Sequence, residues 1–334
     1  MQDSYHITFI NENEYPLWDE FVSRSPQGSF FYTTKWADIL KNTFNRNYKI
    51  AVCSRRAKWL AGTILFINRR LRRSLITPVP LQFFNAPIFY PPTHEKYQKT
   101  VAHILEISDS FSRFFSYNFP LWIVTTPYTI SDLRAYQWHD CIVEPTYSYV
   151  LDLNPGEDPA EFYSQSVRRK IKQASQYQPQ VVKNDLPGQF IKLYQKSYLR
   201  HNQSPFIEVS VLNKLFENVK RIPQFKLYYV KFGEKTVAGR LICIDNQHIY
   251  DLLAGSSDET GTASVFLVDH IIRKYAGQCI SFDFMGADHE QIEQFKRGFG
   301  AKLMHGFKIT GRAKFPFSLL YKLQKSALRR RRAL

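Results

Sequence analysis

The stretch SFDFMGADHEQIEQFKRGFGAKL, Ser281–Leu303, decides the fold expected for this chain, because a strand, a capped helix and a glycine exit follow one another in it. Aromatic and β-forming residues ahead of Gly286 predict a buried strand that ends in a turn. Asp288, with Gln291 three residues later, matches a capping box, and apolar residues then recur at helical spacing. The glycines of the GFG motif end this helix, and residues 301–309 resume as a strand.

A pair of distant segments indicates an internal repeat. Residues 48–68, YKIAVCSRRAKWLAGTILFIN, and residues 225–245, FKLYYVKFGEKTVAGRLICID, align without a gap. Each consists of an apolar run, a turn and a second aliphatic run that begins near the same Ala-Gly pair, at positions 61–62 and 238–239. This is the pattern of a β-hairpin. Any two hairpins look alike, but the gapless match and the shared pair favour a duplicated domain.

Length and composition allow two globular domains. The chain has 334 residues, of which 44% are hydrophobic and 16% aromatic, so each half is large enough to bury a core. Strands alternate with helices in both halves, which predicts a mixed α/β fold with helices flanking a mixed sheet in each domain. We expect a first domain over residues 1–145, a second over 146–315 and a tail over 316–334.

The charge balance favours polyanionic partners. Lys and Arg number 45 and Asp and Glu 29, which gives a formal net charge of +16. A field of that sign attracts RNA, phosphorylated substrates or anionic lipid. The basic amphipathic tail suits an anionic membrane surface. Alternatively, its leucines dock on the second domain and its end is solvated.

The sequence predicts a cytoplasmic protein. No apolar run approaches the roughly 20 residues of a membrane span, and the first residues lack the basic and apolar regions of a signal peptide. The four cysteines lie far apart, which is typical of buried reduced thiols. If the tail binds lipid, the protein is expected at the inner face of the membrane.

Several common active-site motifs are absent. The sequence has no nucleophile elbow, no metal-spaced His or Cys cluster, no Walker A motif and no Rossmann GxGxxG. The nine His residues are scattered, so a lone catalytic base such as His139 or His305 is not favoured. These absences argue against a hydrolase, a metalloenzyme and a nucleotide-driven ligase. We expect no metal site and no permanently bound cofactor.

The segment SFDFMGADHEQIEQFKRGFG resembles the C-terminal signature of the FemABX-like branch of the GNAT acyltransferase superfamily. The resemblance implies two tandem GNAT-like domains and transfer of an aminoacyl or acyl group to an amine. Ordinary GNAT enzymes hold the pyrophosphate of CoA on a Gly-rich loop that opens a helix. The corresponding loop here, GSSDETGTASVF at 255–266, lacks Gly-x-Gly, and its Asp258 and Glu259 would repel a pyrophosphate. Aminoacyl-tRNA is therefore the favoured donor and acyl-CoA the alternative.

The resemblance also implies the residues of the donor side. Phe295 and Lys296 match a pair that the family places near the tRNA acceptor end, where Lys296 would neutralise a phosphate or polarise the ester carbonyl. Tyr250, in IYDLLAG, matches a site tyrosine. We expect Tyr250 and Lys296 to be catalytic; the alternatives are a core tyrosine and an exposed helix lysine. The other expected donor-binding residues are Arg297, Gly255 and Ser256.

On the acceptor side, Arg200 in SYLRHN occupies the place of an arginine that contacts the phosphate of the substrate, and a guanidinium suits phosphate geometry. Lys35 and Lys41 flank Trp36 in FYTTKWADILK, where the family offers a second phosphate-binding lysine. Either lysine matches that position, so Lys35, Lys41 and the Trp36 between them are all expected to bind substrate. Arg200 and one of the lysines are expected to face one cleft.

These inferences predict a Fem-type N-acyltransferase that moves an aminoacyl group from aminoacyl-tRNA to an amine of a phosphorylated, peptidoglycan-like cell-envelope precursor. The alternative in the same superfamily is an acyl-CoA-dependent N-acetyltransferase of surface polysaccharide or lipid synthesis. The alternative of another class is a non-catalytic basic protein that binds RNA or membrane. The expected partners are tRNA, the phosphorylated precursor and an anionic membrane surface.

Overall fold

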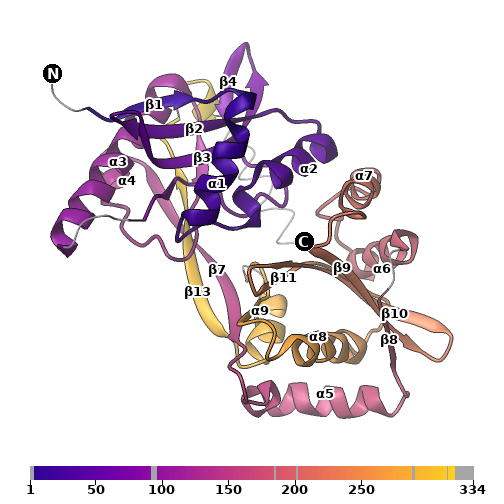
Figure 1. Ribbon diagram of the computed structural model, residues 1–334. Helices are drawn as coiled ribbons and strands as arrows, with labels where there is room; N and C mark the ends of the chain where they lie inside the picture. The colour runs from indigo at the N-terminus through magenta and orange to yellow at the C-terminus, as the bar shows by residue number, and fades with distance from the viewer. Residues whose placement is uncertain are drawn as a thin grey trace. The chain divides into compact units, whose positions relative to one another are not determined.

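The computed structural model describes residues 4–91, 96–183, 186–200, 202–287, 290–313 and 315–319. The predicted Asp288 cap and the tail beyond residue 319 lie outside the described residues. The chain divides into two compact units, Met1–Pro145 with Gly306–Ala333, and Thr146–His305. Figure 1 shows strands flanked by helices in each, so the predicted mixed α/β class is confirmed. None of the described helices is long and apolar enough to cross a membrane.

The first unit is built on a five-stranded sheet, in the order β1-β2-β3-β4 with β5 also paired to β3. The strands of this unit are β1 (His6–Phe9), β2 (Tyr48–Arg55), β3 (Lys58–Arg70), β4 (Arg73–Ile76), β5 (Ile88–Phe89) and β6 (Ile123–Thr125), the last of which belongs to the longer sheet described next. Its helices are η1 (Glu12–Glu14), α1 (Tyr15–Arg24), η2 (Phe30–Tyr32), α2 (Thr34–Phe44), α3 (Tyr97–Asn118) and α4 (Arg134–Gln137). The long helix α3 buries one apolar face, which includes Phe111 and Phe115, in the core of this unit.

The second unit is built on most of an eight-stranded sheet, in the order β6-β13-β7-β12-β11-β10-β9-β8. Its strands are β7 (Ile142–Asp152), β8 (Gln180–Lys183), β9 (Phe225–Phe232), β10 (Lys235–Asp245), β11 (His248–Ser256), β12 (Ser281–Asp283) and β13 (Lys302–Thr310). Its helices are η3 (Pro159–Phe162), α5 (Gln165–Ser175), α6 (Pro187–Arg200), α7 (Val209–Val219), α8 (Thr262–Tyr275) and α9 (Glu290–Arg297). Helix α8 supplies much of the core on one face of the sheet, and α6 covers the other face (Figure 1).

The two predicted hairpins have the same register. Ala61 of β3 pairs with Cys53 of β2, and Ala238 of β10 pairs with Val230 of β9, which are the positions that the gapless alignment makes equivalent. In both hairpins the residue just before the alanine, Leu60 or Val237, has no counterpart on the opposite strand of the hairpin, so the register shifts there. The prediction that the two Ala-Gly pairs occupy equivalent strands is therefore confirmed, down to a shared β-bulge.

The Ala-Gly glycines are explained by helix packing. A Cβ on Gly62 would lie 2.4 Å from the Trp18 ring of α1, and a Cβ on Gly239 would lie 3.2 Å from the Phe190 ring of α6. Trp18 and Phe190 are each the fourth residue of their helix. A Cβ at Gly62 would therefore overlap the ring, whereas a Cβ at Gly239 would make tight contacts with Phe190 and with Tyr229 of β9. The two units thus share an arrangement of strand, two helices and hairpin.

The last strand of each half pairs in the other unit. β7, which ends the first half, pairs with β12 so that Val150 lies opposite Asp283. β13, which ends the second half, pairs with β6 so that Lys308 lies opposite Thr125. The predicted second domain, 146–315, therefore differs from the observed division, in which the described residues from Gly306 to Ala313 belong with the first unit.

Candidate functional site

The sheet of the second unit opens where two parallel strands separate. β11 and β12 pair from His248 opposite Ser281 to Tyr250 opposite Asp283. Beyond that point β12 ends, while β11 continues to Ser256 along β10. The register of β10 with β11 also shifts there, which marks a bulge. In α/β sheets, ligands bind outside the carboxyl ends of parallel strands at such an opening.

Lys296 holds the loop that follows β12. Its side chain comes from α9 and is buried, with 8% of the residue exposed. Its ammonium donates to the carbonyl oxygens of Phe284 at 2.6 Å, Met285 at 2.8 Å and Gly286. An ammonium has three N–H groups, and all three find carbonyl acceptors here. The alternative of an exposed helix lysine is therefore wrong, and contact with a phosphate would require one of these bonds to be exchanged.

A buried ion pair lies beside Lys296. Arg240 of β10 donates to Asp251 of β11, and their side chains are only 7% and 4% exposed. Burial raises the pKa of Asp251, while the positive charges of Arg240 and, after it, Lys296 act to lower that pKa. The guanidinium of Arg240 lies 5.3 Å from the ring centre of Phe295. Arg240 Nε and Asp251 Oδ1 have no hydrogen-bond partner among the residues that the structure describes.

Sequence reasoning missed this ion pair, although a signal was present. Arg240 follows an Ala-Gly pair inside the apolar run VAGRLICI, and Asp251 lies inside IYDLLAG. Charged residues within buried strands are rare unless they are paired or functional. Two such residues on neighbouring strands therefore indicate a buried charge pair near a site.

Tyr250 is the last residue of β11 that pairs with β12, and it is half-buried. Burial raises the pKa of its hydroxyl, and the Asp283 carboxylate on the neighbouring strand raises it further. The hydroxyl therefore remains protonated near neutral pH, the form in which it can donate a hydrogen bond. Because successive strand residues face opposite sides of a sheet, Tyr250 and Asp251 project from opposite faces at the opening.

Gly255 and Ser256 serve helix packing in this structure. A Cβ on Gly255 would lie 2.5 Å from the backbone nitrogen of Tyr194 in α6, so the helix backbone requires glycine there. The backbone N–H of Ser256 donates to the hydroxyl of Ser197 at 2.7 Å, and that hydroxyl donates back to the Ser256 carbonyl at 2.9 Å. Both residues predicted to bind the donor thus have a structural role in joining β11 to α6.

An internal carboxylate occupies the N-terminus of α8. Asp258 Oδ2 accepts hydrogen bonds from Ala263 N at 2.7 Å and from the Thr262 hydroxyl at 3.0 Å, and Oδ1 accepts from Thr260 N at 3.0 Å. Burial acts to raise the pKa of Asp258, but these hydrogen bonds outweigh it and lower the pKa. The carboxylate therefore stands where a helix N-terminus would otherwise receive an anion.

Arg200 and Arg297 contact other parts of the second unit. Arg200, at the exposed end of α6, donates to the carbonyl oxygen of Asp258 at 2.6 Å, so it lies against the loop before α8. Arg297 pairs with Glu293 at 2.6 Å, and Glu293 also accepts from the hydroxyl of Tyr149 at 2.7 Å. Arg297 is 63% exposed at its side chain, so its guanidinium remains accessible to an anion from solvent.

The predicted acceptor residues of the first unit fall into two groups. Lys35 is exposed on the first turn of α2, and Lys41 is half-buried with its ammonium 6.0 Å from the ring centre of Tyr48. Trp36 is only 1% exposed and packs against the aromatic residues of η2. Trp36 is therefore a core residue, contrary to the expectation that it binds substrate, because the apolar stripe of α2 turns it inward.

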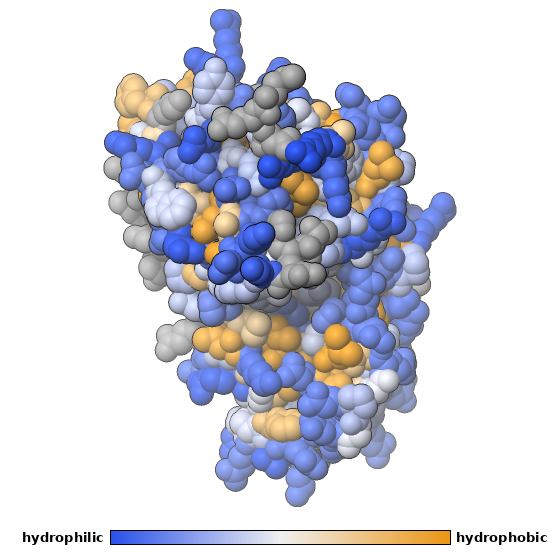
Figure 2. All heavy atoms as spheres, turned by 60° about the vertical axis from the view of Figure 1, so that its left-hand side comes forward, coloured by the Kyte–Doolittle hydropathy of each residue, from blue (hydrophilic) through white to orange (hydrophobic). Residues whose placement is uncertain are grey.

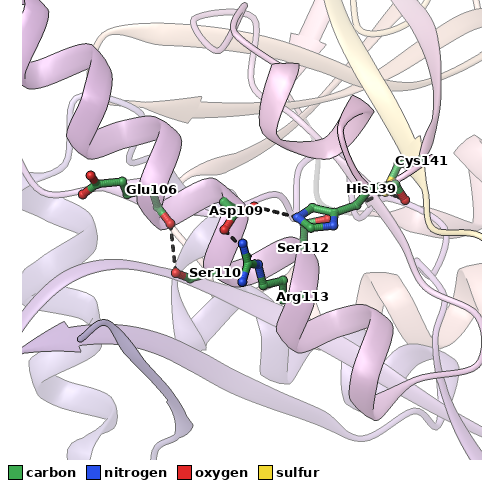
Figure 3. A network of polar contacts seen from close by, with 7 residues as sticks. All are labelled: Glu106, Asp109, Ser110, Ser112, Arg113, His139 and Cys141. Atoms are coloured by element: carbon green, nitrogen blue, oxygen red, sulfur yellow. Dashed lines mark hydrogen bonds and ion pairs between the residues drawn. The ribbon is translucent and has the colours of Figure 1, made fainter. Parts of the chain in front are cut away.

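A polar network in the first unit has the composition of a hydrolase site but not its geometry (Figure 3). His139 Nε2 lies 2.6 Å from Asp109 Oδ1, and Arg113 pairs with the other carboxylate oxygen at 2.9 Å. The Ser112 hydroxyl lies 3.8 Å from the Cys141 sulfur. Burial raises the pKa of the Cys141 thiol, which disfavours the nucleophilic thiolate. The network joins α3 to the segment after α4.

Comparisons with known proteins define the class. The model of the acetyltransferase (GNAT) domain family matches residues 162–297, which run from η3 to α9 and include the opening between β11 and β12. No curated protein sequence matches the chain. The second unit thus contains a GNAT domain, and the protein is an acyltransferase.

Solved structures show the same fold at low sequence identity. The structure of FemX is 13% identical, has a TM-score of 0.67, and the match covers 95% of this chain and 99% of FemX. L-PGS from Bacillus licheniformis is 9% identical with a TM-score of 0.54, and the match covers 93% of this chain and 95% of L-PGS. The C-terminal domain of a candidate lysylphosphatidylglycerol synthetase from Agrobacterium fabrum is 10% identical with a TM-score of 0.53, covering 96% and 98%. The predicted resemblance to Fem-like acyltransferases is confirmed in the fold.

Proposed function

We propose that the protein is a Fem-type aminoacyltransferase that uses aminoacyl-tRNA to acylate an amine of a phosphorylated cell-envelope precursor. The observation that carries this proposal is the Asp258 carboxylate at the N-terminus of α8. That position is where an acyl-CoA-dependent GNAT enzyme would hold a pyrophosphate. Here the chain supplies its own anion.

The resident carboxylate disfavours CoA in two ways. Like charges about 4 Å apart repel by about 1 kcal/mol in water and about 4 kcal/mol at an effective dielectric constant of 20. Displacing the carboxylate would also remove the cap of α8, and a lost cap costs roughly 0.5–2 kcal/mol. An aminoacyl-tRNA donor carries its ester at the end of a nucleic acid and does not need a pyrophosphate on this helix.

The residues at the opening suit the attack of an amine on an ester. The amine nitrogen bonds to the carbonyl carbon, the ester C–O bond breaks, and the ribose hydroxyl leaves with a proton that the amine gives up. Arg240 and Lys296 bring two positive charges against the single carboxylate of Asp251, so this buried cluster favours the oxyanion that develops during attack. Tyr250 lies at the same opening, where its hydroxyl can relay this proton: it passes its own proton to the leaving ribose oxygen and takes up the one that the amine gives up.

The acceptor is proposed from charge and from the neighbouring structures. Arg200 and Arg297 present guanidinium groups on the second unit, and Lys35 is exposed on the first, all suited to phosphate. Lysylphosphatidylglycerol, in the name of one structural neighbour, is an aminoacylated molecule that bears a phosphate. Because aminoacyl-tRNA is an intracellular donor, we place the reaction in the cytoplasm, with a docking role for the basic tail at the inner membrane face.

A CoA-dependent N-acetyltransferase is the second candidate, because the matching family model is described as an acetyltransferase. A transfer assay separates the two. The purified chain is incubated with an extract of phosphorylated envelope precursors and either tRNA charged with labelled amino acids or labelled acetyl-CoA. The proposal expects label on an acceptor amine from charged tRNA only. Transfer from acetyl-CoA alone would overturn it and establish the second candidate.

A further inference from the structure

Helix α5 carries a cationic face that the proposed reaction does not use. Arg168, Arg169 and Lys172 are exposed, and they line an open hollow of about 880 Å³ together with Gln165 and Ser166. No acidic side chain among the described residues lies within ion-pair distance of the three cations. The cationic face of α5, defined by these three residues, is therefore not neutralised by the described part of the chain.

The cationic face adjoins the donor side of the candidate site. The N-terminus of α5 is tied to the end of α9, because Ser164 N–H donates to the Gly298 carbonyl at 2.8 Å. Gly298 lies two residues after Lys296, and a Cβ on it would lie 2.9 Å from the Val167 side chain of α5. On the α8 side, the Lys170 ammonium is 3.6 Å from the position of a Cβ on Gly261, in the loop before α8.

The helix stands on the outer side of the second unit. It packs along α8, which lies between it and the sheet in Figure 1. The view in Figure 2 is turned about the vertical axis, so α5 stays at the lower end, where the surface is mainly hydrophilic. The exposed residues of α5 are all polar or charged, and none of the five that line the hollow is aromatic.

We propose that the cationic face of α5 binds the phosphate backbone of the paired acceptor stem of tRNA. The inference rests on the proposed function and names the surface on which its donor lies. Arg168 and Lys172 are four residues apart, so they project from one side of the helix about 6 Å apart along its axis. Duplex nucleic acid presents closely spaced phosphates, and Arg and Lys are the side chains that contact them.

The composition of the cationic face favours the backbone of a nucleic-acid duplex over single-stranded nucleic acid and over an anionic membrane. Single strands are bound by aromatic side chains on which bases stack, and the hollow has none. Helices that bind anionic membranes place large apolar side chains beside their cations, and the exposed residues of α5 include none. Since α5 is 11 residues long, or about 16 Å, the whole face lies within that distance of its junction with α9. The single-stranded 3′ end of tRNA then extends from the stem toward the opening between β11 and β12.

The test compares two charge-neutralising pairs of equal spacing in the full chain. R168Q/K172Q removes two cations from α5, and K192Q/K196Q removes two exposed cations four residues apart on α6, on the other face of the sheet. Binding of uncharged tRNA and of an acceptor-stem hairpin is measured across salt concentrations. The α5 pair is expected to weaken binding about tenfold at 0.15 M salt and to reduce the salt slope by about 1.8, or 0.9 per lost contact. The α6 pair is expected to change neither.

Equal weakening by the two pairs, or no change with the α5 pair, would overturn the proposal. It would also fail if the α5 pair reduced binding to phosphatidylglycerol vesicles while tRNA binding stayed as in the wild type. The transfer assay separates this surface from the function: the α5 pair should raise KM for aminoacyl-tRNA and leave kcat unchanged. If the wild type transfers from aminoacyl-tRNA and the α5 pair does so with the same KM, the surface is wrong and the function stands. If the wild type binds the stem through α5 but transfers nothing, the function is wrong and the surface stands.

Discussion

Replacing Lys296 with methionine tests whether this lysine organises the candidate site. Met keeps the length and apolar stem of the side chain but removes the ammonium that binds three consecutive carbonyls. The Phe284 carbonyl belongs to a buried residue, so losing its charged donor costs about 2 kcal/mol. Met285 is half-buried and Gly286 exposed, so water can replace the donor at those two carbonyls. Losing a cation beside the buried Arg240–Asp251 pair adds about 1 kcal/mol.

The expected loss of about 3 kcal/mol lowers the midpoint of thermal unfolding by roughly 6–12 °C for a unit of this size. Circular dichroism during heating measures it, and the transfer assay at a temperature below both midpoints measures activity, which should also fall. K302M is the matched control, because Lys302 is exposed and pairs with Asp152 at the surface; its midpoint should stay at the wild-type value. A Lys296→Met variant that melts like the wild type would refute the anchoring role.

Three further variants test the contact between β11 and α6, the Asp258 carboxylate and the role of Arg200. Gly255→Ala should destabilise the chain by about 1–3 kcal/mol in urea unfolding, because its Cβ would meet the backbone of α6, whereas Gly188→Ala, with no atom within 4 Å, should not. Asp258→Asn should remove a stabilisation that the wild type has in full above the ordinary carboxyl pKa of about 3.9 and loses as the pH falls from there through the lower pKa of the folded chain; unfolding measured from pH 7 down to about pH 2 checks it. The same variant should bind CoA more tightly than the wild type in calorimetry. Arg200→Gln should raise KM for the phosphorylated acceptor with little change in midpoint, and an unchanged KM would remove it from the acceptor site.

The two equivalent hairpins could be predicted from the sequence because their signal is local. The two hairpins share an Ala-Gly pair, and each of its glycines lies close to an aromatic ring of an earlier helix, Trp18 of α1 or Phe190 of α6. The exchange of β7 and β13 between the units could not be predicted. The alternation of apolar and polar residues indicates which face of a strand is buried, but it does not indicate which strand pairs with it.

The candidate site was predicted less completely than the fold. The catalytic role of Lys296 stays a prediction; its three carbonyl partners could not be predicted, because acceptors on the main chain leave no trace in the sequence. Asp258 was expected to repel a pyrophosphate, and the structure adds that it caps α8. Trp36 was misassigned because an aromatic residue between two lysines is compatible with either a binding surface or a core. Whether Arg200 and Lys35 bind one acceptor stays a prediction.

Calorimetry can identify the acyl donor by comparing the binding of its two candidates. The full chain is titrated with acetyl-CoA and with tRNA that carries a non-hydrolysable aminoacyl linkage, at several salt concentrations. We expect tRNA to bind with an affinity that falls steeply as the salt concentration rises, as counterion release requires, and acetyl-CoA to give no heat of binding. Tight binding of acetyl-CoA, together with absent or salt-insensitive binding of tRNA, would contradict this expectation.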